Sequence, residues 1–192
     1  MIIKDKRKHL LNVAMHLFVK NGFHASPTSM IAKKANLSVG TLFNHFETKA
    51  ILIEEIYISI KRHIHETLLN VIVKNDSVHD QLQMMYHEMV LWGLNNPDEF
   101  NYLELFEHSP LRDSYKTDAS MGMVKEFRSK IFDAIGKDSI CNVYPSYSLI
   151  YIDHSIHAAT RFLLEQEIED VDGFIDKSFD LLWNGFKAKK ER

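Results

Sequence analysis

Residues 26–49, with the sequence SPTSMIAKKANLSVGTLFNHFETK, constrain the fold of this 192-residue chain more than any other segment. Ser26, followed by proline, is a good helix N-cap, because its hydroxyl accepts a backbone N–H and proline fits the first helical turn. Asn36 tolerates the left-handed conformation in which helices often end. We therefore predict a short helix ending in a tight turn, with one apolar face formed by Ile31, Ala32 and Ala35.

A second short helix is predicted two residues after that turn. Ser38 is again a good N-cap, and Leu42 and Phe46 lie one turn apart, so one face of this helix can be buried. Its other side chains are left for a partner, namely Thr41, Phe43, Asn44 and His45. Two short helices joined in this way form a helix-turn-helix, whose second helix enters the major groove of DNA.

The segment before this motif supplies a third helix. Its apolar residues follow the i, i+3, i+4 spacing of an amphipathic helix, at Leu10, Val13, Ala14, Leu17 and Phe18. Gly22 then marks its C-terminal end. We define residues 1–47 as the headpiece, and a three-helix unit of about 45 residues is marginal unless it packs against more protein.

The order of residues in the headpiece resembles the N-terminal domain of the tetracycline-repressor (TetR) family of bacterial transcription regulators. The resemblance is carried by LFVKNGF and MIAKKANLSVGTLFNHFETKAIL, between Lys8 and Leu52. Two residues depart from the family pattern: Asn36 replaces the usual turn glycine, and Phe43 replaces the usual tyrosine, whose hydroxyl reaches a phosphate. The resemblance implies a homodimeric repressor that binds a palindromic double-stranded DNA operator and is released by a small apolar effector.

Within this motif we expect Thr41 and Asn44 to approach base edges, since an asparagine amide is suited to adenine. Phosphate contacts are expected from Thr28, His45 and Lys49. The predicted DNA-binding residues are Thr28, Ser38, Val39, Gly40, Thr41, Phe43, Asn44, His45 and Lys49.

The distribution of charge supports this interpretation. The net charge of −3 would by itself argue against a nucleic-acid partner. However, residues 1–50 hold eight Lys and Arg residues against Asp5 and Glu47, a net charge of +6, which leaves −9 for the rest of the chain. A basic headpiece attached to an acidic body is typical of a protein that contacts DNA with one end.

Residues 48–192 are predicted to form a larger helical domain, which gives an all-α chain of about nine helices. No strand-like alternation persists, and Gly and Pro are few, at seven and four residues. The first helix of this domain starts at Thr48 and continues for about 25 residues with an apolar stripe, so we expect it to transmit movement to the headpiece. Further helices are predicted over 77–95, 98–108, 120–135, 146–167 and 171–186, with a loop at 109–120.

The second domain contains two candidate binding surfaces. The last two helices carry wide apolar stripes, which predict half of an isologous four-helix dimer interface; a buried intrachain core is the alternative. The predicted interface residues are Ser155, Ala159, Phe162, Phe179, Leu182, Trp183 and Phe186. Met and aromatic residues also predict an adaptable effector pocket, lined by Met85, Met89, Trp92, Phe106, Met123, Phe127 and Arg161.

Other chemistries have little support in the sequence. His154 and His157 lie one turn apart, but no Cys or carboxylate follows at a spacing typical of a metal site. No catalytic motif is present, so we expect neither an enzyme nor a cofactor. A single cysteine, Cys141, and the lack of a long apolar run predict a cytoplasmic protein without a membrane segment. Two alternatives stay open: a helical-bundle enzyme or metal-handling protein, and an interaction adaptor that no longer binds DNA.

Overall fold

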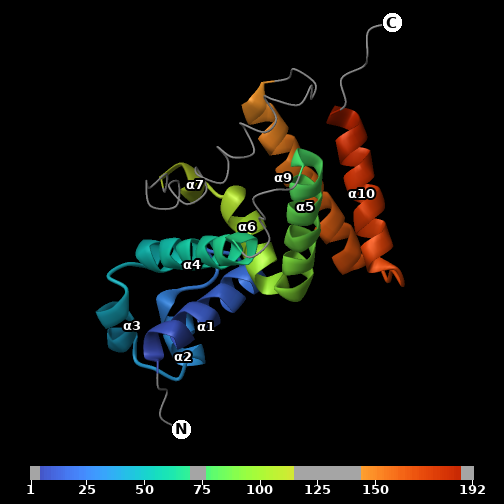
Figure 1. Cartoon of the computed structure of the whole chain (residues 1–192). Coiled ribbons are helices and arrows are strands. Elements are labelled where there is room, and N and C mark those ends of the chain that lie inside the picture. Colours follow the sequence, from blue (N-terminus) through green and yellow to red (C-terminus); the bar gives the residue numbers. More distant parts are fainter. Residues whose placement is uncertain (1–4, 70–76, 115–143, 187–192) are drawn as a thin grey trace, which may run out of the picture. The chain divides into compact units, whose positions relative to one another are not determined.

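The computed structural model of the chain describes residues 5–69, 77–114 and 144–186 (Figure 1). Within these ranges the chain forms nine helices and no strand, in agreement with the predicted all-α class. The helix predicted at 120–135 lies outside the described residues. No helix in the described ranges is both long and apolar enough to cross a lipid bilayer.

The three helices of the headpiece form where the sequence predicts them. They are α1 (Lys6–Asn21), α2 (Thr28–Lys34) and α3 (Val39–His45). Gly22 ends α1 with a positive φ of 82°, and Asn36 adopts a φ of 55° in the turn between α2 and α3. Leu10, Ala14, Leu17 and Phe18 are buried on one side of α1, as their spacing predicts.

The caps of the two short helices differ from each other. Ser38 caps α3 as predicted, because its Oγ accepts the N–H of Thr41 at 3.0 Å. The prediction for Ser26 is wrong: Pro27 occupies the N-cap position of α2, and the Ser26 hydroxyl is fully buried and donates to the Leu17 carbonyl at 3.0 Å. The serine hydroxyl therefore bonds to the C-terminal part of α1 instead of capping the next helix.

The remaining helices agree with the predicted ranges to within a few residues. They are α4 (Lys49–Leu69), α5 (Val78–Asn95), α6 (Pro97–Glu107), α7 (Leu111–Ser114), α9 (Pro145–Glu165) and α10 (Val171–Phe186). Thr48 and Ser77 cap α4 and α5, with their hydroxyls accepting the N–H groups of Ile51 and Asp80. The one-turn helix α7 corrects the prediction of a loop throughout 109–120.

The chain divides into two compact units, and the division differs from the predicted boundary at residue 47. The first unit comprises Met1–Arg62 and Asn96–Thr117, and the second comprises His63–Asn95 and Asp118–Arg192. Most of α4 and all of α6 therefore belong to the same unit as the headpiece.

Helix α6 completes the core of the first unit. Its Tyr102 is fully buried and lies edge-on to Phe23, with 5.7 Å between ring centroids, and 6.4 Å from the ring of Phe18. The Tyr102 hydroxyl donates to the Ile53 carbonyl of α4 at 2.8 Å. One side chain of α6 therefore contacts the end of α1 and also α4, which supplies the covering that a three-helix headpiece requires.

A buried tyrosine also organises the second unit, in which α5 packs on both α9 and α10. Tyr86 of α5 is fully buried, and its hydroxyl lies 2.7 Å from Ser178 Oγ of α10 and 3.2 Å from Ser155 Oγ of α9. The hydroxyl also donates to the Ser155 carbonyl at 3.2 Å. This one polar group therefore joins all three helices.

We predict that Tyr86→Phe lowers the free energy of unfolding by about 1–3 kcal/mol, because two serine hydroxyls lose their shared partner in a buried position. Tyr147→Phe is the matched control, since Tyr147 is 55% exposed, and its effect should stay within about 0.5 kcal/mol. Urea unfolding followed by circular dichroism measures both values. Equal effects of the two changes would contradict a structural role for the Tyr86 hydroxyl.

Candidate nucleic-acid interface

Helix α3 has one side that is buried in the headpiece and one side that is exposed. Leu42 and Phe46 are fully buried, and α3 packs on α2, whose Ile31 and Ala32 are buried as well. This agrees with the predicted core face. The exposed side of α3 consists of Val39, Gly40, Phe43, Asn44 and His45.

Thr41 and Ser38 are hydrogen-bonded to each other at the start of α3. Their hydroxyl oxygens are 2.9 Å apart, in addition to the bond from the Thr41 N–H to Ser38 Oγ. Thr41 is half-buried, whereas Asn44 is exposed. Of the two predicted base contacts, Asn44 is therefore the one whose side chain is more accessible.

Gly40 leaves an open space in the middle of this surface. A Cβ added at Gly40 would meet Ser38 Oγ at 3.8 Å, which is an ordinary van der Waals distance. Packing within the headpiece therefore does not require glycine here. Since glycine weakens a helix relative to alanine, its presence suits a position where a partner approaches the backbone closely.

The structure places Lys49 differently from the sequence prediction. Its Nζ donates to the Phe23 carbonyl at 2.5 Å and lies 5.7 Å from the centre of the Phe18 ring. Burial lowers the pKa of Lys49 from its usual value. The sequence analysis predicted that this ammonium group contacts a DNA phosphate. In the structure it instead forms contacts inside the first unit, where it connects the start of α4 to the end of α1.

Arg7 is a positioning residue that the sequence analysis did not identify. Its guanidinium forms an ion pair with Glu55 of α4 and lies 5.4 Å from the centre of the Phe46 ring, at the end of α3. A cation over an aromatic face is stabilising, so Arg7 links α1, α3 and α4. The sequence shows only a basic residue in the first turn of a helix, and neither partner is near it in the chain.

Exposed positive charge lies on the two helices that precede α3. Lys6 and Lys8 are exposed on α1, and Lys33 and Lys34 are exposed on α2. Thr28, predicted as a phosphate contact, lies half-buried at the start of α2. These side chains give the headpiece the cationic groups that a DNA backbone attracts.

The residues predicted to line the effector pocket are divided between the two units, and some lie outside the described residues. Met85 and Trp92 are buried in the second unit, and Met89 is half-buried against its core. Phe106 instead belongs to the first unit, where it stacks on Tyr57 at 4.3 Å. Arg161 lies 3.9 Å from Glu165 on its own helix, and Met123 and Phe127 fall outside the described residues. Phe106 and Met85 therefore belong to different units, and the effector pocket stays a prediction.

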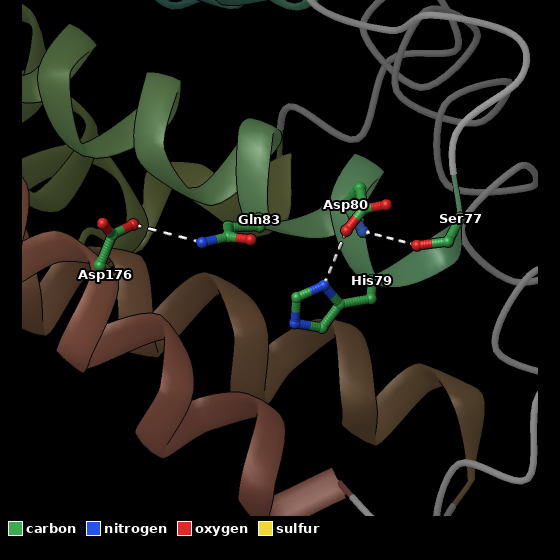
Figure 2. A network of polar contacts seen from close by, with 5 residues as sticks. All are labelled: Ser77, His79, Asp80, Gln83 and Asp176. Carbon is green, nitrogen blue, oxygen red and sulfur yellow. Dashed lines mark hydrogen bonds and ion pairs between the residues drawn. The ribbon is translucent and has the colours of Figure 1, made fainter.

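Polar contacts join α5 and α10 in the second unit. Gln83 donates to Asp176 across the two helices at 3.2 Å (Figure 2). At the start of α5, a hydrogen bond from His79 lowers the pKa of the Asp80 carboxyl (Figure 2). A shallow hollow over these helices is lined by Gln83, Met84, His87, Glu88 and Asp176, none of which belongs to the predicted pocket. Within the described ranges, no three His, Cys, Asp or Glu side chains are placed to hold a metal ion.

The predicted dimer interface is corrected in part. Phe179 and Leu182 of α10 and Ala159 of α9 are buried in the core of the second unit, where α5, α9 and α10 pack on one another. Ser155 bonds to Tyr86, and Trp183 packs partly buried against the same core. Phe162 is exposed, whereas nothing is described of the Phe186 side chain. The intrachain alternative therefore holds for much of the α10 stripe.

Residues 10–56 match the family described as bacterial regulatory proteins, tetR family. The N-terminal quarter of the chain is therefore similar to the DNA-binding region of that family. It is 46% identical over 56 residues to the transcriptional regulator QacR of Staphylococcus aureus, covering 29% of this chain and 28% of QacR. The match therefore spans just over a quarter of the length of that relative.

Solved structures of the family share the whole fold. A TetR-family transcription regulator from Shewanella sp. PV-4 matches with a TM-score of 0.86 and 23% identity, over 97% of this chain and 100% of that chain. The regulator FadR from Bacillus subtilis, solved in complex with stearoyl-CoA, matches with a TM-score of 0.74 and 15% identity, over 93% of this chain and 98% of that chain. The fold thus extends over both compact units.

The contacts of Lys49 predict how its substitution affects stability and DNA binding. Lys49→Met retains the aliphatic stem but removes the bond to Phe23, so the free energy of unfolding should fall by about 1 kcal/mol. Because its ammonium is used inside the protein, the slope of log affinity for DNA against log salt should stay unchanged. Fluorescence anisotropy at several salt concentrations measures this slope. A decrease by about one unit would show that Lys49 contacts a phosphate after all.

Proposed function

We propose that this chain is a ligand-responsive transcriptional regulator, acting as a repressor that binds a palindromic operator as a homodimer. The observation that carries the proposal is the exposed side of α3, where Asn44 lies near Gly40 on a helix whose other side is buried through Leu42. Such a helix fits the major groove, where an asparagine amide can bond to adenine. The name of QacR as a transcriptional regulator supports the same function.

Phosphate contacts complete this docking. We assign them to Thr28 and His45, with the exposed Lys33 and Lys34 adding long-range attraction. Arg7 and Lys49 act differently in this scheme: through their partners inside the first unit, they fix how α3 is presented. The resulting function is binding without catalysis or a cofactor, in the cytoplasm.

The homodimer follows from geometry, because one headpiece spans only a half-site and a two-fold operator requires two. The surface that supports it is a stripe along α9. Its exposed residues recur every three or four positions and cover an arc of about 120° of the helix. They are Tyr144, Tyr147, Ile150, Tyr151, His154, Ala158 and Phe162.

The effector is assigned to the second unit, as a small apolar molecule. FadR, which shares this fold, was solved with stearoyl-CoA, whose stearoyl chain is apolar. The chain passes between the two units within α4 and again between α5 and α6. A ligand that favours one arrangement of the second unit can therefore change the spacing of two headpieces and, by linkage, must bind more weakly to the operator complex.

Gly40→Ala tests the DNA contact. The added methyl group meets no close contact in the headpiece, so the free energy of unfolding should rise by up to about 1 kcal/mol. Operator affinity should nevertheless drop about tenfold, because the methyl group lies between α3 and the groove. Thermal melts and gel shifts on a duplex selected from a random library measure both quantities. A stable variant with wild-type affinity would place the DNA contact elsewhere.

The dimer surface on α9 generates a separate prediction. Ile150 is 52% exposed, so Ile150→Glu should leave the helical content intact and yield monomers at micromolar concentration with weaker operator binding. Phe179→Asp is the contrasting control, since it places a charge in the core and should unfold the second unit. Light scattering and circular dichroism separate the two outcomes. A stable Ile150→Glu dimer would show that α9 does not form the interface.

A further inference from the structure

The exposed side of α3 carries two apolar side chains that the polar contacts proposed above leave unused. Val39 is 39% exposed and Phe43 is 45% exposed. They are four residues apart and therefore neighbours on the helix surface. Because Leu42 and Phe46 are fully buried on the same short helix, this exposure does not result from a loosely packed element.

Helical geometry places the apolar pair next to the predicted adenine contact. With about 100° between successive residues, Val39, Phe43, Gly40 and Asn44 follow one another around α3 within an arc of about 140°. Gly40 adds no side chain to this arc, and the space above it is open. The arc is therefore apolar along one edge, empty in the middle and polar along the other edge.

The chemistry of this arc matches one base of DNA. The C5-methyl group of thymine is the methyl group that the bases display in the major groove, beside the hydrogen-bond donors and acceptors of the base edges. A phenylalanine ring or a valine side chain forms no hydrogen bond, so these two side chains cannot recognise the polar edges. Phosphate oxygens are excluded as their partners for the same reason.

We infer that Val39 and Phe43 recognise thymine C5-methyl groups in each operator half-site, beside an adenine held by Asn44. This inference rests on the proposed function, since it requires α3 to lie in the major groove. Adenine and thymine occupy opposite strands of one base pair, and both face that groove. The contacted positions of the half-site are therefore A·T pairs, and specificity there comes from buried methyl groups as well as from hydrogen bonds.

The test changes the DNA and leaves the wild-type protein intact. A duplex of about 30 base pairs, selected by the full chain from a random library, spans two half-sites. Each thymine is then replaced singly by deoxyuridine, which keeps the pairing with adenine and removes only the methyl group. At one or two thymines in each half-site, affinity should fall about fourfold, as expected for one methyl group removed from water.

Protein variants identify the side chains that contact each methyl group. In the Phe43→Ala variant, replacing one of these thymines by deoxyuridine should cause no further loss of affinity. In the Val39→Ala variant, the same should hold at another of these thymines. Phe43→Tyr retains the ring, so it should keep the wild-type response. Met30→Ala is the matched control, because Met30 is a 40% exposed apolar residue on α2, outside the recognition helix, and its response should equal that of the wild type.

The outcomes separate this inference from the function on which it rests. If no selected duplex binds with salt-dependent affinity, the regulator function itself is wrong. If a duplex binds but every deoxyuridine substitution changes affinity by less than about twofold, the regulator stands and the methyl contact is wrong. The inference is also overturned if the responses persist in both Val39→Ala and Phe43→Ala, or if Met30→Ala removes them.

Discussion

The structure of the headpiece depends on the burial of Tyr102 beneath α1 and α4. Three short helices cannot bury enough apolar surface to be stable alone, and α6 supplies the missing side of the core. Tyr102 contacts Phe18 and Phe23 with its ring and the Ile53 carbonyl with its hydroxyl, so its ring and hydroxyl connect separate helices. Within the described residues this unit therefore contains six helices, in which most of α4 and all of α6 and α7 belong to the same body as α1, α2 and α3.

The sequence predicted the features that depend on local spacing. Leu42 and Phe46 lie one turn apart and are buried, and Asn36 has the left-handed conformation that its turn position requires. Both follow from interactions within a few residues along the chain. Ser26 was misassigned as a cap, and the internal partner of Lys49 was not predicted, because the carbonyl groups of Leu17 and Phe23 that they contact are 9 and 26 residues away. Such choices are made by tertiary packing, and residue type alone does not reveal them.

The apolar stripe of α10 illustrates a second limit of the sequence. Its width correctly indicates that the helix is covered, but width does not distinguish a partner subunit from neighbouring helices of the same chain. Phe179 and Leu182 are buried against α5 and α9, and the hydroxyl of Tyr86 reaches Ser178 on this same helix. The exposed stripe lies instead on α9, where tyrosines alternate with small and polar residues and the sequence signal for an interface is weaker.

In the proposed function, the replacement of the usual tyrosine by Phe43 changes the balance between affinity and specificity at the DNA surface. A tyrosine hydroxyl on a phosphate adds affinity for every sequence, because phosphates are the same at every base pair. A phenylalanine ring on a thymine methyl group adds affinity only where thymine is present. The fixed presentation of α3 by Arg7 and the open space at Gly40 support this exchange, since a methyl contact depends on close and reproducible approach. The loss of one hydroxyl is therefore compatible with DNA binding and shifts its basis from the backbone toward the bases.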